Sequence, residues 1–120
     1  MMLGDIFVLD AVTHPYNFDE SNYAVPKDAR VIAELSYKMV RNPPNPAYGL
    51  PPEVYLRDWP VEDLANVLFH ESQTDCAVMH PLPINAFADG LCSIEKALEA
   101  RQKWPNRFRL QWELDFGEVD

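Results

Sequence analysis

Two histidines stand shortly after apolar runs in this chain. The first run covers residues 6–9 and is followed by Asp10, Thr13 and His14, and the second covers residues 76–79 and is followed by His80. Apolar runs of this kind are typical of buried parallel strands, and groups at the carboxyl ends of such strands line the crevice where α/β proteins bind ligands. An imidazole in that position can bind a cation or transfer a proton near neutral pH. The pattern therefore predicts a site at His14, with Asp10 orienting it and His80 contacting substrate or acting as a general acid or base.

Structural roles for the same side chains stay open. His14 could simply hydrogen-bond its own loop, and Asp10 could be a carboxylate that accepts backbone N–H bonds. His70 lies inside an amphipathic stretch, which favours a place on the outer surface or at the edge of the core. Glu113 and Asp115, near the end of a third apolar stretch, are further candidates for the site, although solvated edge carboxylates are commoner.

The composition excludes several classes of protein. The chain has 120 residues, 48% of them hydrophobic, and a net charge of −9, from 19 acidic and 10 basic side chains. This size and composition predict one folded domain, and the charge repels nucleic acid and anionic membranes. No apolar run approaches the roughly 20 residues that span a bilayer, and no basic segment precedes the N-terminal run, so we expect a soluble, cytoplasmic protein.

Two cysteines and three tryptophans are expected to be core residues. Cys76 and Cys92 lack the spacing of a zinc site, and in a chain without a signal peptide they should stay reduced and buried. No glycine-rich phosphate loop or Gly-x-Ser-x-Gly turn occurs, which removes the common nucleotide-binding and serine-hydrolase interpretations. The tryptophans should pack against the core; they are Trp59, Trp104 and Trp112.

The hydrophobic periodicity predicts alternating strands and helices. A helix is expected over residues 27–41, ended by Pro43 and Pro44, and a proline-rich insertion over 42–60 should pack on the rest of the molecule. A second helix is expected with Pro60 at its first position and an end near 71–74, and a buried strand covers 75–80. Asp89 is the expected N-cap of a third helix that ends at Pro105, and a third strand covers 108–114. This order predicts an α/β fold with a parallel sheet.

Three segments carry a resemblance to a known family. They are residues 9–15, Leu-Asp-Ala-Val-Thr-His-Pro; residues 75–79, Asp-Cys-Ala-Val-Met; and residues 97–108, which end in Trp-Pro-Asn-Arg-Phe. Together they resemble the N-terminal part of the amidohydrolase-related (amidohydrolase 2) family, which includes aminocarboxymuconate-semialdehyde decarboxylase. The resemblance covers almost the whole chain.

The resemblance implies a metal-dependent enzyme. Members of this family are (β/α)₈ TIM barrels that hold a divalent metal, commonly zinc, which activates water or polarises a substrate oxygen. By this resemblance His14 matches a metal ligand, whereas Val12 stands where the family has its first histidine ligand. The chain would then be the N-terminal βα units of such a barrel, incomplete here because a (β/α)₈ barrel typically needs about 250 residues. The implied reaction is hydrolysis or decarboxylation of a small carboxylate, amide or ester substrate.

Two other interpretations remain beside the enzyme. In one, Val12 marks a lost metal site, and the chain is a non-catalytic relative used for binding or assembly. In the other, 120 residues are the whole polypeptide, and the exposed edge of its small parallel sheet is covered by a second copy in a homo-oligomer.

Overall fold

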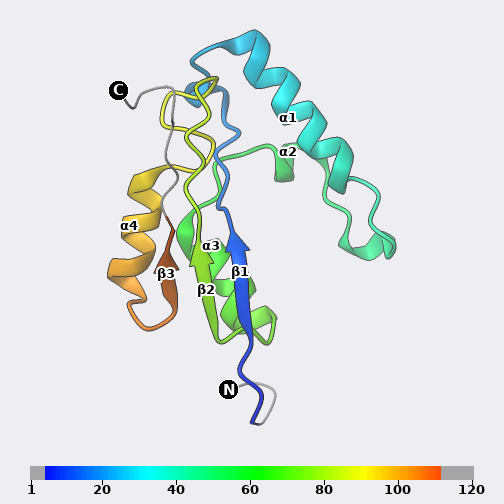
Figure 1. Cartoon of the computed structure of the whole chain (residues 1–120). Coiled ribbons are helices and arrows are strands. Elements are labelled where there is room, and N and C mark those ends of the chain that lie inside the picture. Colours follow the sequence, from blue (N-terminus) through cyan, green and yellow to red (C-terminus); the bar gives the residue numbers. More distant parts are fainter. Residues whose placement is uncertain (1–4, 112–120) are drawn as a thin grey trace.

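A parallel sheet forms the centre of the molecule. The computed structural model describes residues 5–111, in which β1 (Leu9–Thr13), β2 (Cys76–Met79) and β3 (Phe108–Leu110) lie side by side in the order β1-β2-β3. Leu9 pairs with Cys76, Ala77 pairs with Phe108, and the register between β1 and β2 shifts between Asp10 and Thr13. The α/β class and the parallel sheet predicted from the periodicity are confirmed. Figure 1 shows the three arrows pointing the same way.

The main core lies between this sheet and two helical segments. Helix α3 (Val61–Asn66) runs on into a π-helical segment, η3 (Val67–Glu71), and α4 (Ile94–Lys103) connects β2 to β3. Small residues of α4 pack against the apolar side chains of β2 and β3. From η3, Phe69 packs edge to face on Phe108 of β3, with 5.2 Å between the ring centroids. The apolar stripe of each segment explains why it packs there.

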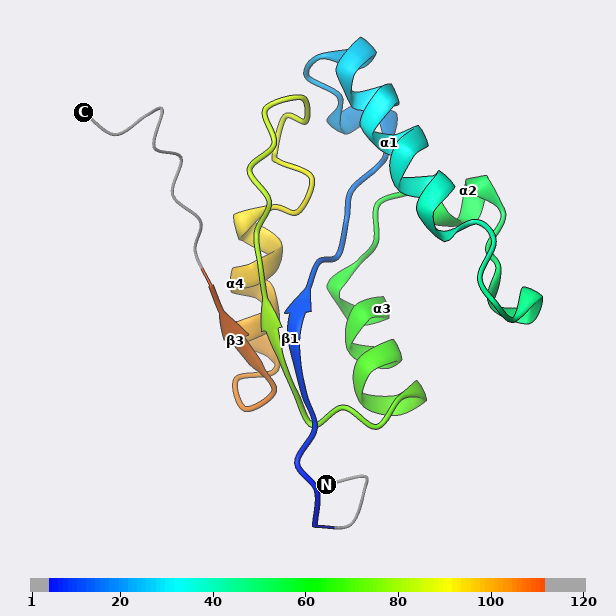
Figure 2. The same ribbon diagram turned by 45° about the vertical axis from the view of Figure 1, so that its right-hand side comes forward.

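The remaining helices extend beyond the carboxyl ends of the strands. Helix α1 (Pro26–Val40) lies outside the sheet (Figure 2), and it packs through Ala29 and Ala33 on the loops that follow β1 and β2. Short helical segments η1 (Glu20–Asn22), η2 (Pro46–Tyr48) and α2 (Pro52–Tyr55) complete this part. The predicted helix over 27–41 is thus confirmed. The insertion over 42–60 packs only in part: Tyr55 and Leu56 lie against the cluster that contains Ala29 and Ala33, whereas Tyr48, Leu50 and Val54 are exposed, contrary to the expectation. It also contains two short helical turns that its proline content did not suggest.

Two predictions about single elements are wrong: the start of α4 and the burial of β1. Helix α4 begins at Ile94 with Ser93 as its N-cap, whereas Asp89 lies in a turn, where its main-chain amide binds Asn22 instead. Strand β1 is not buried on both faces, because Leu9 is 51% and Val12 56% exposed in the described part of the chain. The predicted third strand is observed over Phe108–Leu110, and residues 112–114 lie outside the described residues.

Candidate functional site

His14 and His80 meet at the carboxyl ends of β1 and β2. Their ring centroids are 5.7 Å apart, and the rings are inclined at 65°. The two strands hold them there, because the main-chain amide of His80 donates to the Thr13 carbonyl oxygen at 3.1 Å and the Thr13 hydroxyl donates to the Val78 carbonyl oxygen at 2.9 Å. The prediction that both strand ends come to one edge of the sheet is therefore confirmed.

Both imidazoles are bound to main-chain carbonyl groups. The Nδ1 atom of His14 lies 2.9 Å from the His80 carbonyl oxygen, and the Nε2 atom of His80 lies 2.7 Å from the Ala11 carbonyl oxygen. A carbonyl oxygen only accepts hydrogen bonds, so each of these nitrogens must carry the proton. In the neutral rings, the lone pair is left on Nε2 of His14 and on Nδ1 of His80.

The two rings differ in their access to solvent. His80 is only 8% exposed, so its imidazole chiefly ties the end of β2 to β1. His14 is half-buried and stacks on Tyr16 with an interplanar angle of 13° and 5.5 Å between centroids. Burial raises the pKa of the Tyr16 hydroxyl above its ordinary value, so this neighbour stays neutral near pH 7. The unprotonated nitrogen of His14 is the group best placed to bind a cation or accept a proton.

Asp10 has a local hydrogen bond instead of a contact with either histidine. Its carboxylate accepts from the main-chain amide of Val12 at 3.1 Å, where the register of β1 shifts. This is the backbone-capping role that the sequence left open. Val12 itself is more than half exposed, and its side chain has no atom that could bind a metal.

The ring nitrogens of His14 fit the requirements of a divalent metal. His14 presents a lone pair while its other ring nitrogen donates to a carbonyl, which is the usual arrangement of a metal-binding histidine. Catalytic zinc is commonly held by three protein ligands. Residues 5–111 contain no group of three His, Cys, Asp or Glu side chains placed to hold a metal ion. A complete ligand set for such a metal is therefore not found among residues 5–111.

The remaining predicted residues lie away from this pair or outside the described part. His70 is exposed in η3, as its place in the amphipathic stretch predicted. Cys76 and Cys92 are buried, as predicted, and are not joined in a disulfide. The other candidates lie outside the described residues; they are Trp112, Glu113 and Asp115.

Lys96 is a residue near the site that the sequence analysis did not single out. It lies in the first turn of α4, and its ammonium group donates to the Pro15 carbonyl oxygen next to His14. The sequence contained one signal, a lysine in the first turn of a helix, where the helix dipole disfavours a cation unless other groups stabilise it. The acceptors that stabilise Lys96 are distant in the sequence and could not be identified from it.

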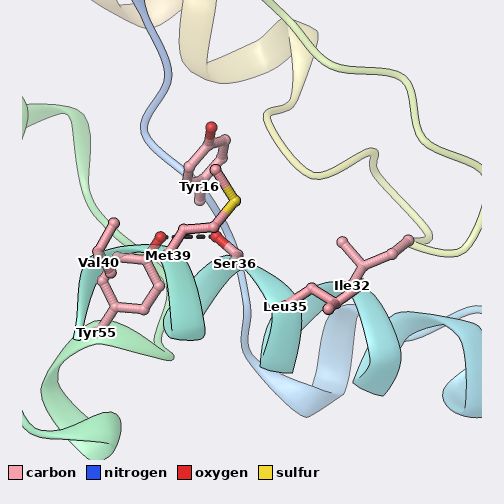
Figure 3. A pocket seen from close by; sticks show the side chains of 7 residues that line it. All are labelled: Tyr16, Ile32, Leu35, Ser36, Met39, Val40 and Tyr55. Carbon is pink, nitrogen blue, oxygen red and sulfur yellow. Dashed lines mark hydrogen bonds between the residues drawn. The ribbon is translucent and has the colours of Figure 1, made fainter. Parts of the chain in front are cut away.

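An apolar groove of about 400 Å³ lies along α1, and Tyr16 forms part of its wall. Figure 3 shows the residues that line it, with the hydroxyl groups of Ser36 and Tyr55 joined by a hydrogen bond of 2.7 Å. Tyr16 is thus shared between the groove and the stack on His14. The lining residues are Tyr16, Ile32, Leu35, Ser36, Met39, Val40 and Tyr55.

Comparisons with known proteins name no family for this chain. Models of protein families, curated proteins and solved structures were searched, and none of them matches. In the described part of the chain, none of the helices has the length and apolar character needed to cross a membrane. The site must therefore be interpreted from its own geometry.

Proposed function

We propose that His14 is one metal ligand of a metal-dependent enzyme of the amidohydrolase type, in which β1–β3 are the first strands of a (β/α)₈ barrel. The proposed reaction is hydrolysis or decarboxylation of a small carboxylate, amide or ester substrate. The observation that carries the proposal is the hydrogen bond from His14 Nδ1 to the His80 carbonyl oxygen, which leaves Nε2 of His14 with its lone pair. A metal, when bound, would activate water or polarise a substrate oxygen.

The chain's own residues have separate tasks in this proposal. His14 supplies the ligand atom, and the main chain of His80 sets its protonation and orientation. The His80 ring, through Ala11, keeps the two strand ends together, and the lone pair on its Nδ1 could accept a proton from a group that enters the site. Asp10 supports the irregular part of β1 by accepting from the Val12 amide.

A zinc titration tests the ligand role of His14. In calorimetry on the full chain, His14→Ala should weaken zinc binding by about 10-fold or more, since even the loss of an outer-shell partner usually costs that much. His70→Ala is the matched control, because His70 is exposed on η3 and should leave the affinity unchanged. Equal zinc affinity in the wild type and His14→Ala, or no zinc binding at all, would contradict the proposal.

One observation favours a second candidate, a non-catalytic relative that binds or assembles. Val12 stands where the family has a histidine, and Leu9 and Val12 in β1, like Ile6 and Phe7 just before it, expose more than half of their surface. Exposed apolar edge strands favour pairing with another chain. If Val12→His creates zinc binding that the parent lacks, and sedimentation shows that the parent self-associates, this second function replaces the first.

A further inference from the structure

Lys96 joins three segments of the chain beside the candidate site. Its Nζ atom donates to the carbonyl oxygens of Pro15 at 3.2 Å and Trp59 at 2.8 Å, and it forms an ion pair with Asp58. These three acceptors match the three N–H bonds of an ammonium group. The Lys96 side chain is only 15% exposed, whereas Asp58 is 53% exposed. Lys96 is therefore an internal connection and not a surface ion pair.

The segment that Lys96 holds is the one that carries His14. Pro15 is buried and follows His14 directly, and the next residue, Tyr16, stacks on the His14 ring. The Tyr16 carbonyl oxygen also accepts from the Trp59 amide at 2.9 Å. These bonds hold the chain that follows β1 against the C-terminal end of the insertion over 42–60. The ammonium group of Lys96 on α4 lies where the two segments meet.

We infer that Lys96 is a positioning residue for His14. Without its ammonium group, the carbonyl oxygens of Pro15 and Trp59 lose a charged donor, and the backbone on the C-terminal side of His14 loses its link to α4. The hydrogen bond between His14 Nδ1 and the His80 carbonyl oxygen depends on the path of this backbone. This inference deepens the proposed function, because it names what keeps His14 in the orientation that a ligand needs.

Lys103 provides a matched control on the same helix. Its ammonium group also forms ion pairs, with Glu62 and Glu99, but all three side chains are about half exposed and lie away from His14. Lys103→Met therefore removes a lysine and its ion pairs from α4 without touching the segment that carries His14. Lys96→Met removes the internal connection, and Lys96→Arg keeps a cation in its place.

The first measurement is the tautomer of His14 by long-range ¹H–¹⁵N NMR on the full chain. The wild type, Lys103→Met and Lys96→Arg should show the single form with the proton on Nδ1, and Lys96→Met should lose it. An unchanged tautomer in folded Lys96→Met, or the same change in Lys103→Met, overturns the inference. If Lys96→Met does not fold, Lys96→Ala replaces it, because it removes the same three bonds. Loss of the single tautomer in that variant supports the inference, whereas its retention overturns it.

The second measurement separates this inference from the proposed function. Zinc affinity should fall about 10-fold or more in Lys96→Met and stay unchanged in Lys103→Met. If the wild type binds no zinc, the proposed function fails, but the tautomer result still decides whether Lys96 positions His14. If zinc binding is lost in His14→Ala and unchanged in Lys96→Met, the positioning role fails while the proposed function stands.

Discussion

At the scale of the residue, the partners of a side chain decide which of its atoms can react. His14 and His80 are the same residue type at the ends of adjacent strands, yet they present different nitrogens because different ring atoms face carbonyl oxygens. His14, a half-buried residue, keeps its lone pair on Nε2, whereas His80 is buried and its ring links the two strands. The chemistry available at this edge of the sheet therefore depends on the backbone of the neighbouring strand.

The burial of Cys92 leads to a prediction about a single side chain. Burial raises the pKa of its thiol from about 9 to about 12, because desolvation disfavours the thiolate. The unfolded chain loses this proton at a lower pH than the folded chain does. The contribution to stability is thus present in full below about pH 9 and falls as the pH rises toward 12. In denaturant unfolding between these pH values, the free energy of unfolding should fall more steeply with pH in the wild type than in Cys92→Ala. Equal slopes in the two proteins would contradict a raised pKa of Cys92.

At the scale of the element, hydrogen bonds at the ends of a helix decide where it begins. Helix α4 starts after Ser93, whose hydroxyl oxygen accepts from the Lys96 amide at 3.2 Å. Asp89 is an equally good capping residue by type, but its segment forms a turn in which Gly90 has a φ of +79°. A Cβ atom at Gly90 would lie 2.7 Å from the Leu82 carbonyl oxygen, so this turn requires glycine.

The cap of α4 gives a prediction at this scale. Ser93→Ala should lower the free energy of unfolding by about 1 kcal/mol, because one amide of the first turn loses its acceptor. Ser93→Asp should restore most of this loss, since a carboxylate can accept the same bond and is favoured at a helix N-terminus. Urea unfolding of the three proteins measures both effects. Similar losses in the two variants would show that the cap is not what stabilises α4.

At the scale of the whole molecule, one buried amide joins the loops that follow β1 and β2. The Asn22 side chain donates to the carbonyl oxygens of Asn17 and Gly90 at 3.2 and 3.0 Å and accepts from the Asp89 amide at 3.0 Å. Asn22 is 3% exposed, so these bonds are shielded from water. Together with Lys96, Asn22 holds the loops on which α1 packs in place relative to the sheet.

Replacing this amide tests its role. Asn22→Asp turns the donating NH₂ into an oxygen that faces two carbonyl oxygens, and stability should fall by about 1–3 kcal/mol or more. Asn66→Asp is the control, because Asn66 is exposed and its partner is the exposed Glu71. Thermal unfolding at one pH compares the two variants. An equal effect in both would mean that Asn22 is not a link between the loops.

Most of the secondary structure could be predicted because its signals are local. The apolar stripe and the flanking prolines predict α1 within one residue of its observed bounds, and the three strands follow from short apolar runs. The same periodicity placed His14 and His80 at one edge of the sheet, since parallel strands bring their carboxyl ends together. The family resemblance and the metal site remain predictions.

The sequence by itself determined the order of strands and helices and the residue types at the strand ends, because hydrophobic periodicity and proline act within a few residues. Only the tertiary structure decided which nitrogen of His14 is free, that Asp10 caps its own strand, and that Lys96 holds Pro15. These outcomes depend on hydrogen-bond partners up to 81 residues apart in the chain. Such partners are chosen by packing, which no local pattern in the sequence encodes.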